Sequence, residues 1–268
     1  MKIANDKLNL IGHFAWTKLF CLVVLILGSN LQTYSQSRSV TSPDRVAITK
    51  KKLVITRSGQ FLRHRPDKRT AVIYYPFISG LRDPAVLRRV RSLLNVANVS
   101  GLSLREHREN FWLDELDYEV NHNANHILDI TFTSQGEGPY PASHSRTIPI
   151  DLKTGRILKA RDVFVEDRFD ELAASVEVRL KLEVAELIKT AKENIPDADN
   201  VIELLVKQKF EVKNLDDFSI SQEGVKFLYD PDFPHVYVGF EPLGGYLIPY
   251  SSLKSFIKAT GPLAQFVK

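Results

Sequence analysis

Cysteine is nearly absent from this chain of 268 residues, and the position of the one that remains is informative. Cys21 lies inside an apolar run from Leu19 to Leu27, close to the N-terminus. Disulfide frames, thiolate metal sites and cysteine nucleophiles all need cysteines within the folded domain. If the apolar run is removed as a targeting segment, the remaining protein has no thiol, and these three kinds of chemistry are excluded.

A run long enough to span a membrane is missing as well. A helix needs about 20 apolar residues to cross the hydrocarbon of a bilayer, but the run from Leu19 is bounded by Lys18 and Ser29. A basic leader, a short apolar core and small residues before Gln36 are typical of a secretory signal. We therefore predict a signal peptide over residues 1–35, cleaved near Ser35, and an exported protein that is periplasmic or extracellular. An uncleaved membrane anchor is the alternative.

Neither sign of charge is in large excess. The chain has 36 Lys and Arg against 32 Asp and Glu, and residues 1–35 hold three of the former and one of the latter, which leaves 33 against 31. Proteins that bind nucleic acids gather Lys and Arg on one face to meet phosphates. The nearly neutral remainder gives no reason to expect a nucleic acid as partner.

The motifs of common catalytic and cofactor sites are not found. Ser79 and Ser100 are each followed by glycine but lack the Gly-x-Ser-x-Gly elbow of hydrolases, and the chain has no glycine-rich phosphate loop. No group of residues supplies a nucleophile, a base and an orienting group together. We expect no cofactor and no catalytic site.

Histidines near acidic residues offer the best catalytic alternatives. His122 and His126 are four residues apart, a spacing that suits a metal pair on a helix, and Asp129 follows as an acid. The stretch from Asn121 to His126 has the composition of a turn between strands, where these side chains need not converge. His107 with nearby glutamates is a second pairing. The alternative function is a metal-dependent envelope hydrolase that uses His122 and His126.

Strand and helix patterns are present along most of the chain. Period-two alternation of β-branched and aromatic residues predicts strands at Val46–Thr56, Ala71–Ile78, Phe111–Val120, Ile127–Thr133, Arg146–Leu152, Phe218–Ser221, Val225–Tyr229, Val236–Phe240 and Tyr246–Ile248. Apolar residues at steps of three and four predict helices at Pro84–Ala97 with Asp83 as N-cap, Asp167–Glu193, Ala198–Phe210, and from Ser251 or Ser252 to Lys258.

The connections between the predicted strands are short, which favours antiparallel pairing. The predicted fold class is α+β, with a mostly antiparallel sheet and helices packed on one face. We expect a flexible lead-in over residues 36–44, followed by two contiguous α/β halves over residues 45–160 and 161–268.

Three stretches, in order along the chain, resemble a known extracytoplasmic domain family. They are Tyr75-Pro76-Phe77-Ile78-Ser79-Gly80-Leu81 before a capped helix; Leu116-Asp117-Tyr118-Glu119-Val120 with Asp151-Leu152-Lys153-Thr154-Gly155-Arg156 and Asp162-Val163-Phe164; and Phe218-Ser219-Ile220-Ser221-Gln222-Glu223-Gly224-Val225 with Ile248-Pro249-Tyr250-Ser251-Ser252-Leu253. Their order is similar to that of the domain shared by RsiV-like lysozyme-sensing anti-sigma factors and the N-terminal region of some peptidoglycan deacetylases. The resemblance implies this fold, with a deacetylase-associated-like first half and an RsiV-like second half.

The chain also departs from that family. Only 18 residues precede the apolar core, which is too short for a sigma-binding segment, and no deacetylase domain follows. Gly138-Pro139-Tyr140-Pro141 stands where many relatives have a Gly-Ala-His-Pro-like loop. We therefore expect the shared module alone, without an anti-sigma role.

An aromatic and acidic loop is the surface that we expect to bind a partner. The candidate residues are Tyr229, Asp230, Asp232, His235 and Tyr237, with Tyr140 on a second loop. Tyrosine combines a large contact area with a polar tip, and the resemblance implies a lysozyme-facing region here. Alternatively, Phe233 and Tyr237 pack under the loop and its prolines stiffen it. The predicted function is an exported, non-catalytic cell-envelope module that binds peptidoglycan or a lysozyme-like protein; a structural or assembly partner is a third possibility.

Overall fold

The computed structural model describes residues 44–59, 61–109, 113–137, 141–231 and 233–268. The predicted signal peptide with Cys21, most of the lead-in, and the candidate site residues Tyr140 and Asp232 lie outside the described residues. Among the described helices, none has both the length and the apolar composition needed to cross a bilayer. The fold is mixed α+β, as predicted.

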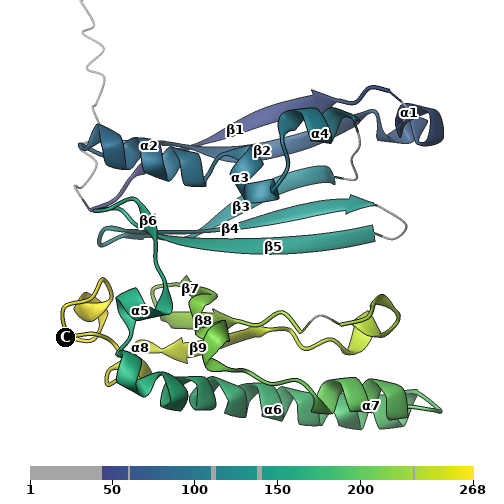
Figure 1. Ribbon diagram of the computed structural model, residues 1–268, viewed down its shortest axis with the longest axis vertical. Helices are drawn as coiled ribbons and strands as arrows, with labels where there is room; N and C mark the ends of the chain where they lie inside the picture. The colour runs from purple at the N-terminus through teal and green to yellow at the C-terminus, as the bar shows by residue number, and fades with distance from the viewer. Residues whose placement is uncertain (1–43, 60, 110–112, 138–140, 232) are drawn as a thin grey trace, which may run out of the picture. The chain divides into compact units, whose positions relative to one another are not determined.

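A six-stranded sheet forms the first part of the described chain, with its strands paired in chain order (Figure 1). The strands are β1 Ala47–Thr56, β2 Thr70–Ser79, β3 Leu113–Ala124, β4 Ile127–Glu137, β5 Pro141–Asp151 and β6 Arg156–Ile157. All neighbours are antiparallel except β2 and β3, which run parallel. A parallel pair needs a crossover connection, and the segment between β2 and β3 supplies it.

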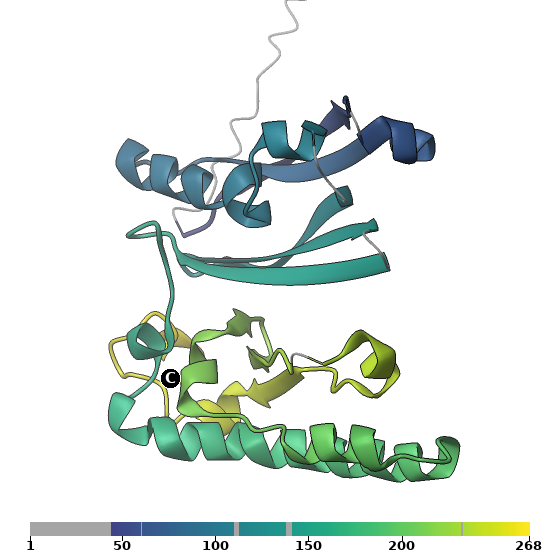
Figure 2. The same ribbon diagram turned by 45° about the vertical axis from the view of Figure 1, so that its right-hand side comes forward.

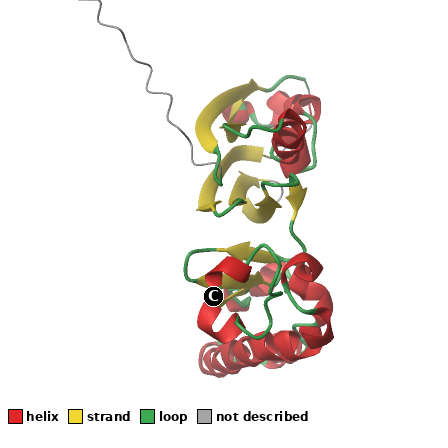
Figure 3. Ribbon diagram, turned by 90° about the vertical axis from the view of Figure 1, so that its left-hand side faces the viewer, coloured by secondary structure: helices red, strands yellow, loops and turns green. Residues whose placement is uncertain are grey.

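Helices fill the connections of this sheet. Between β1 and β2 lie α1 Phe61–His64 and the 3₁₀ turn η1 Pro66–Lys68, and the crossover from β2 to β3 contains α2 Pro84–Leu93, α3 Val96–Ser100 and α4 Leu104–Glu109. The buried side chains of α2 and α3 join those of the sheet in one hydrophobic cluster. Figure 3 shows the helices on one side of these strands.

The predicted helix Pro84–Ala97 is interrupted. Asp83 caps it as expected, because its Oδ1 accepts hydrogen bonds from the backbone N–H groups of Ala85 and Val86 at 2.7 and 3.2 Å. The helix stops at Leu93 because the Asn95 side chain starts a new one: its Oδ1 accepts from Asn98 N at 2.8 Å. Asparagine competes well for such N-terminal positions. One predicted helix is therefore two.

Long helices and a small sheet form the second part. The helical elements are α5 Ala160–Val163, η2 Glu166–Arg168, α6 Phe169–Asn194, α7 Asp199–Val206, η3 Val212–Asp216, η4 His235–Phe240, α8 Tyr250–Leu253 and η5 Ala264–Phe266. The strands β7 Phe218–Ile220, β8 Gly224–Leu228 and β9 Gly245–Pro249 pair antiparallel. After Pro196 the chain reverses, and α7 runs back along the end of α6 (Figure 2).

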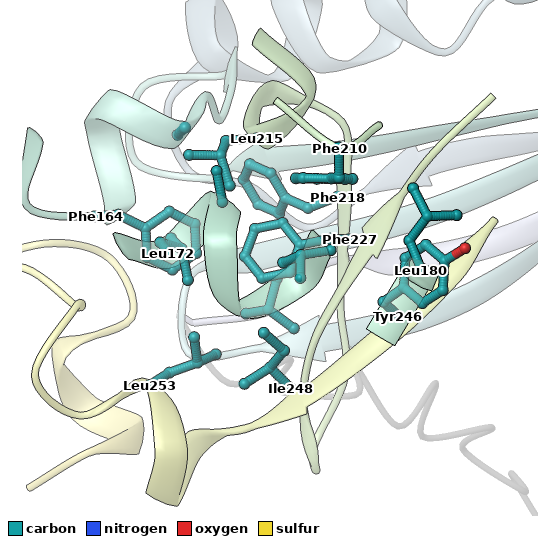
Figure 4. Close-up of a cluster of buried hydrophobic side chains, with 14 of the residues drawn as sticks. Phe164, Leu172, Leu180, Phe210, Leu215, Phe218, Phe227, Tyr246, Ile248 and Leu253 are labelled. Carbon is teal, nitrogen blue, oxygen red and sulfur yellow. The ribbon is translucent and has the colours of Figure 1, made fainter. Parts of the chain in front are cut away.

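The second hydrophobic cluster lies between α6 and this small sheet. Leu172, Val176, Leu180 and Val184 recur every four residues on α6 and are all buried. The Phe227 ring lies 5.6 Å from that of Phe164 (Figure 4). The predicted spacing of α6 is thus confirmed by the face that it buries.

Three predictions in this part were wrong. The helix predicted to end at Phe210 ends at Val206. Residues 236–240 form a 3₁₀ helix and not a strand; prolines at 234 and 242, which lack the N–H that strand pairing needs, flank them. The last helix begins at Tyr250 after Pro249, so neither serine caps it, and it ends at Leu253 because Ile257 forms a β-bridge with Phe164.

Candidate functional site

A long excursion of the chain separates β8 from β9. This β8–β9 excursion covers residues 229–244, is described except for residue 232, and contains η4. The Tyr229 N–H donates to the Gly244 carbonyl at 2.8 Å, one residue beyond the last sheet pair, Leu228 with Gly245. The hairpin therefore closes at its base, and the excursion projects past the end of the strands (Figure 1).

The excursion buries its aromatic side chains and exposes its aliphatic ones. Phe233, Tyr237 and Phe240 are half-buried and pack against the second hydrophobic cluster. In contrast, Val236, Val238 and Leu243 are 78%, 53% and 94% exposed. Residues three apart lie on the same side of a 3₁₀ helix, so Tyr237 and Phe240 share the inner side of η4. The outer side is left with aliphatic groups.

Glu183 of α6 holds the end of the excursion and the start of β9 in place. Its Oε1 accepts from Leu243 N at 2.7 Å, and its Oε2 accepts from the Tyr246 hydroxyl at 2.8 Å. Burial, reinforced by the Glu183 carboxylate, raises the pKa of Tyr246 far above its ordinary value. Tyr246 thus remains a hydrogen-bond donor at every physiological pH, and its bond to Glu183 persists.

The predicted binding residues have different roles in the structure. The Tyr229 ring lies 6.0 Å from that of Phe210, and its hydroxyl donates to Gln208 Oε1 at 2.8 Å. This tyrosine therefore holds the base of the excursion, and its hydroxyl is engaged. Tyr237 packs inward, whereas Asp230 and His235 are exposed.

Two acidic residues of the excursion, Asp230 and Glu241, interact electrostatically. Glu241 is half-buried, and burial together with the nearby Asp230 carboxylate raises the pKa of Glu241. Two acids of the excursion thus lie close to each other. The aliphatic residues of the excursion were not predicted as exposed, because the valines at 236 and 238 alternate in the sequence as in a strand. The signal that could have identified them is the group of prolines at 231, 234 and 242, which is unusual in a paired strand.

The two histidines of the proposed metal site do not converge. The predicted turn is shorter than expected, since β3 continues through Ala124 and only Asn125 and His126 turn, with φ of 56° and 61°. His122 is buried in β3, where burial lowers its pKa and its ring contacts that of Phe266. Over the described ranges, no three His, Cys, Asp or Glu side chains are grouped so as to hold a metal ion.

Asp129, the acid of that hypothesis, has a structural position. It is fully buried on β4, where Oδ2 accepts from the backbone N–H of Ile220 at 2.7 Å. Its Oδ1 accepts from Asn121 Nδ2 at 2.6 Å and Ser219 Oγ at 3.2 Å. Burial raises the pKa of Asp129 to about 6, although these three donors act in the opposite direction. The carboxylate thus binds the edge strand β7 of the second sheet.

His107 has a different partner from the glutamates suggested by the sequence. Its Nε2 lies 2.9 Å from Ser100 Oγ, on the preceding helix α3. Glu106 instead accepts from the Ser103 N–H at 2.7 Å, and Glu109 pairs with Arg105. Burial, with a contribution from the Arg57 charge, lowers the pKa of His107. The ring is therefore a neutral hydrogen-bonding group at physiological pH.

Comparison with known proteins identifies a shared fold. No family model and no curated protein matches this chain. The crystal structure of a DUF3298 family member from Bacteroides fragilis NCTC 9343 is similar at a TM-score of 0.54 and 13% identity, over 84% of this chain and 99% of that one. That of a DUF3298 family protein from Pseudomonas aeruginosa PAO1 has a TM-score of 0.49 and 13% identity, over 82% and 96%. The first likeness shows that this chain has a fold similar to that of an uncharacterised domain family.

Proposed function

We propose that this protein is an exported, non-catalytic binding module of the cell envelope, and that the β8–β9 excursion is its recognition surface. The observation that carries the proposal is the exposure of Val236, Val238 and Leu243 on a segment whose base is fixed to the core. Export rests on the predicted signal peptide, and the envelope setting rests on the resemblance to RsiV-like domains.

The energetics of such a surface favour binding. Fully burying a valine or leucine side chain is worth about 1.5–3 kcal/mol, and here that gain is left for a partner. The bonds from Leu243 and Tyr246 to Glu183 hold the segment in place, which reduces the entropy lost when a partner orders it. Exposed aliphatic side chains on a pre-ordered segment are thus suited to contact an apolar pocket on a partner.

The acidic residues of the excursion indicate which kind of partner fits. Asp230 is exposed and lies close enough to Glu241 to raise its pKa, so the excursion carries two neighbouring acidic groups. Acidic groups around an apolar centre complement a basic protein. A lysozyme-like protein therefore fits better than a glycan strand, because the described candidate tyrosines are not free to stack on a sugar: Tyr229 is engaged with Gln208 and Phe210, and Tyr237 packs inward.

A retention assay tests this assignment. We expect the full-length protein to be retained on immobilised lysozyme, and the variants Val236→Asp and Leu243→Asp to lose at least about tenfold in affinity, since each places a charge in an apolar contact. Val178→Asp is the matched control, because Val178 is 60% exposed on α6 and should bind as the wild type does.

Insoluble peptidoglycan serves as the second bait in the same assay. Retention on peptidoglycan alone, with the same loss in both excursion variants, would identify a glycan ligand for this surface. If the wild type is retained on neither bait, or if both excursion variants bind as tightly as Val178→Asp, the proposal is wrong.

A further inference from the structure

A cavity lies between the helices of the crossover and the first sheet. Its volume is about 250 Å³. It is lined by residues of α3, of the turn after it and of α4, and by residues of β3, β4 and β5. We call it the α3 cavity, because α3 and the turn after it form one wall while β3, β4 and β5 form the other. It lies in the first part of the chain, whereas the β8–β9 excursion belongs to the second.

Strand register brings the sheet side of this cavity together. Leu116 on β3 and His144 on β5 both pair with Ser134 on β4, and Phe132 pairs with Arg146. Cross-strand partners have neighbouring side chains on one face of a sheet. Two rows of side chains therefore line the cavity. Leu116, Ser134 and His144 form one row, and Phe132 and Arg146 form the other.

The polar groups that line the cavity are neutral or basic. Leu113, Leu116 and Phe132 are buried and form an apolar floor. The polar members are hydroxyls, imidazoles and one guanidinium, and no Asp or Glu is among the lining residues that the structure describes. An apolar cavity with a few convergent polar groups is the usual form of a small-molecule site. The absence of acids favours an anionic ligand.

Arg146 is positioned to recognise such an anion. Its Nη1 donates to the carbonyl oxygens of Asn98 and Val99 at the end of α3, which holds the guanidinium at the cavity. A guanidinium carries five N–H donors, so others remain for a carboxylate, and arginine binds carboxylates with paired donors. On the opposite wall, buried His107 is hydrogen-bonded to Ser100 at 2.9 Å.

We propose that the α3 cavity binds a small carboxylic acid with an aromatic or branched apolar body. The carboxylate lies at Arg146 and the apolar body rests on Phe132 and the two leucines. Size supports this class, because an apolar cavity of about 150 Å³ is enough to bind benzene, and the α3 cavity is larger. The site is separate from the proposed recognition surface.

Titration calorimetry with three probes of similar shape tests the charge preference. Phenylacetate is the anion, phenylacetamide is its neutral counterpart and phenethylamine is the cation. We expect the full-length protein to bind phenylacetate with a Kd of about 1 mM or lower, phenylacetamide at least about tenfold more weakly, and phenethylamine not measurably. No binding of phenylacetate, or equal binding of all three probes, would overturn the proposal.

Two variants locate the site. Arg146→Gln should weaken phenylacetate at least about tenfold and leave phenylacetamide unchanged, whereas Arg88→Gln, an exposed arginine on α2, should match the wild type. Ser134→Leu places a larger apolar side chain in the cavity and should abolish binding of both probes while the protein stays folded by circular dichroism. Unchanged phenylacetate affinity in Arg146→Gln and in Ser134→Leu would show that the anion binds elsewhere and would refute the assignment.

Discussion

Replacing Asp129 with asparagine is expected to remove a pH-dependent loss of stability of about 3 kcal/mol between pH 3 and pH 7. Burial raises the pKa of this carboxyl from 3.8 to about 6 in the folded protein. One pKa unit corresponds to about 1.4 kcal/mol, so a shift of roughly two units gives about 3 kcal/mol.

The direction follows from proton binding. The folded state holds the Asp129 proton more tightly than the unfolded state does, so protonated Asp129 stabilises the fold below about pH 4. This contribution is lost as the pH rises toward and through 6. Asparagine keeps an oxygen to accept from the Ile220 N–H, while the side chains of Asn121 and Ser219 can rotate to accept from the new amide. The variant therefore has the same fold without the titration.

Urea unfolding of both proteins from pH 3 to pH 7 measures the effect. The difference in unfolding free energy between wild type and Asp129→Asn should shift by about 3 kcal/mol over this range. Asp197→Asn, an exposed carboxylate between α6 and α7, should follow the wild type. Asp129→Ala should be less stable than the wild type at every pH by about 1–3 kcal/mol, because the Ile220 N–H loses its acceptor. A constant difference between wild type and Asp129→Asn would contradict the burial of a titrating carboxyl at this position.

Gly244→Ala is expected to destabilise the protein by about 2 kcal/mol or more and to displace the β8–β9 excursion. Gly244 has φ of +66°, and a Cβ there would collide with the carbonyl oxygen of Tyr229. The left-handed conformation alone costs an L-residue about 1–2 kcal/mol, and a backbone atom cannot move aside as a flexible side chain can. The bond from Tyr229 N to Gly244 O that closes the base would be lost.

Gly239→Ala is the matched control within the same excursion. A Cβ at Gly239 meets no atom within 4 Å, so this variant should keep the stability of the wild type within about 0.5 kcal/mol. Thermal unfolding followed by circular dichroism compares the two. Equal melting temperatures for both variants would show that the base of the excursion is not closed as described.

Elements whose patterns are local were predicted well from the sequence. The four-residue spacing of Leu172, Val176 and Leu180 is a property of α6 itself, and the capping role of Asp83 depends only on the next three residues. The failures depend on distant partners. Residues 236–240 alternate as a strand does, but they form a 3₁₀ helix whose Tyr237 and Phe240 pack against residues distant in the sequence.

The candidate site shows the same contrast between local sequence patterns and contacts with distant residues. The segment from Tyr229 to Tyr237 was predicted from the sequence as a binding surface, but which side chains it exposes depends on contacts far along the chain. Tyr229 is held by Gln208, which lies 21 residues earlier, and the Leu243 N–H binds Glu183, which lies 60 residues earlier. The α3 cavity is a stronger case, because only strand register brings Ser134 and Arg146 to one wall.

Hydrogen exchange of the protein with and without lysozyme tests the recognition surface most directly. We expect slower amide exchange in the β8–β9 excursion, centred on η4, when lysozyme is bound, and unchanged exchange at the exposed valine of α6, Val178. The contradicting result is protection that falls outside residues 229–244 while the amides of η4 exchange as they do in the protein alone.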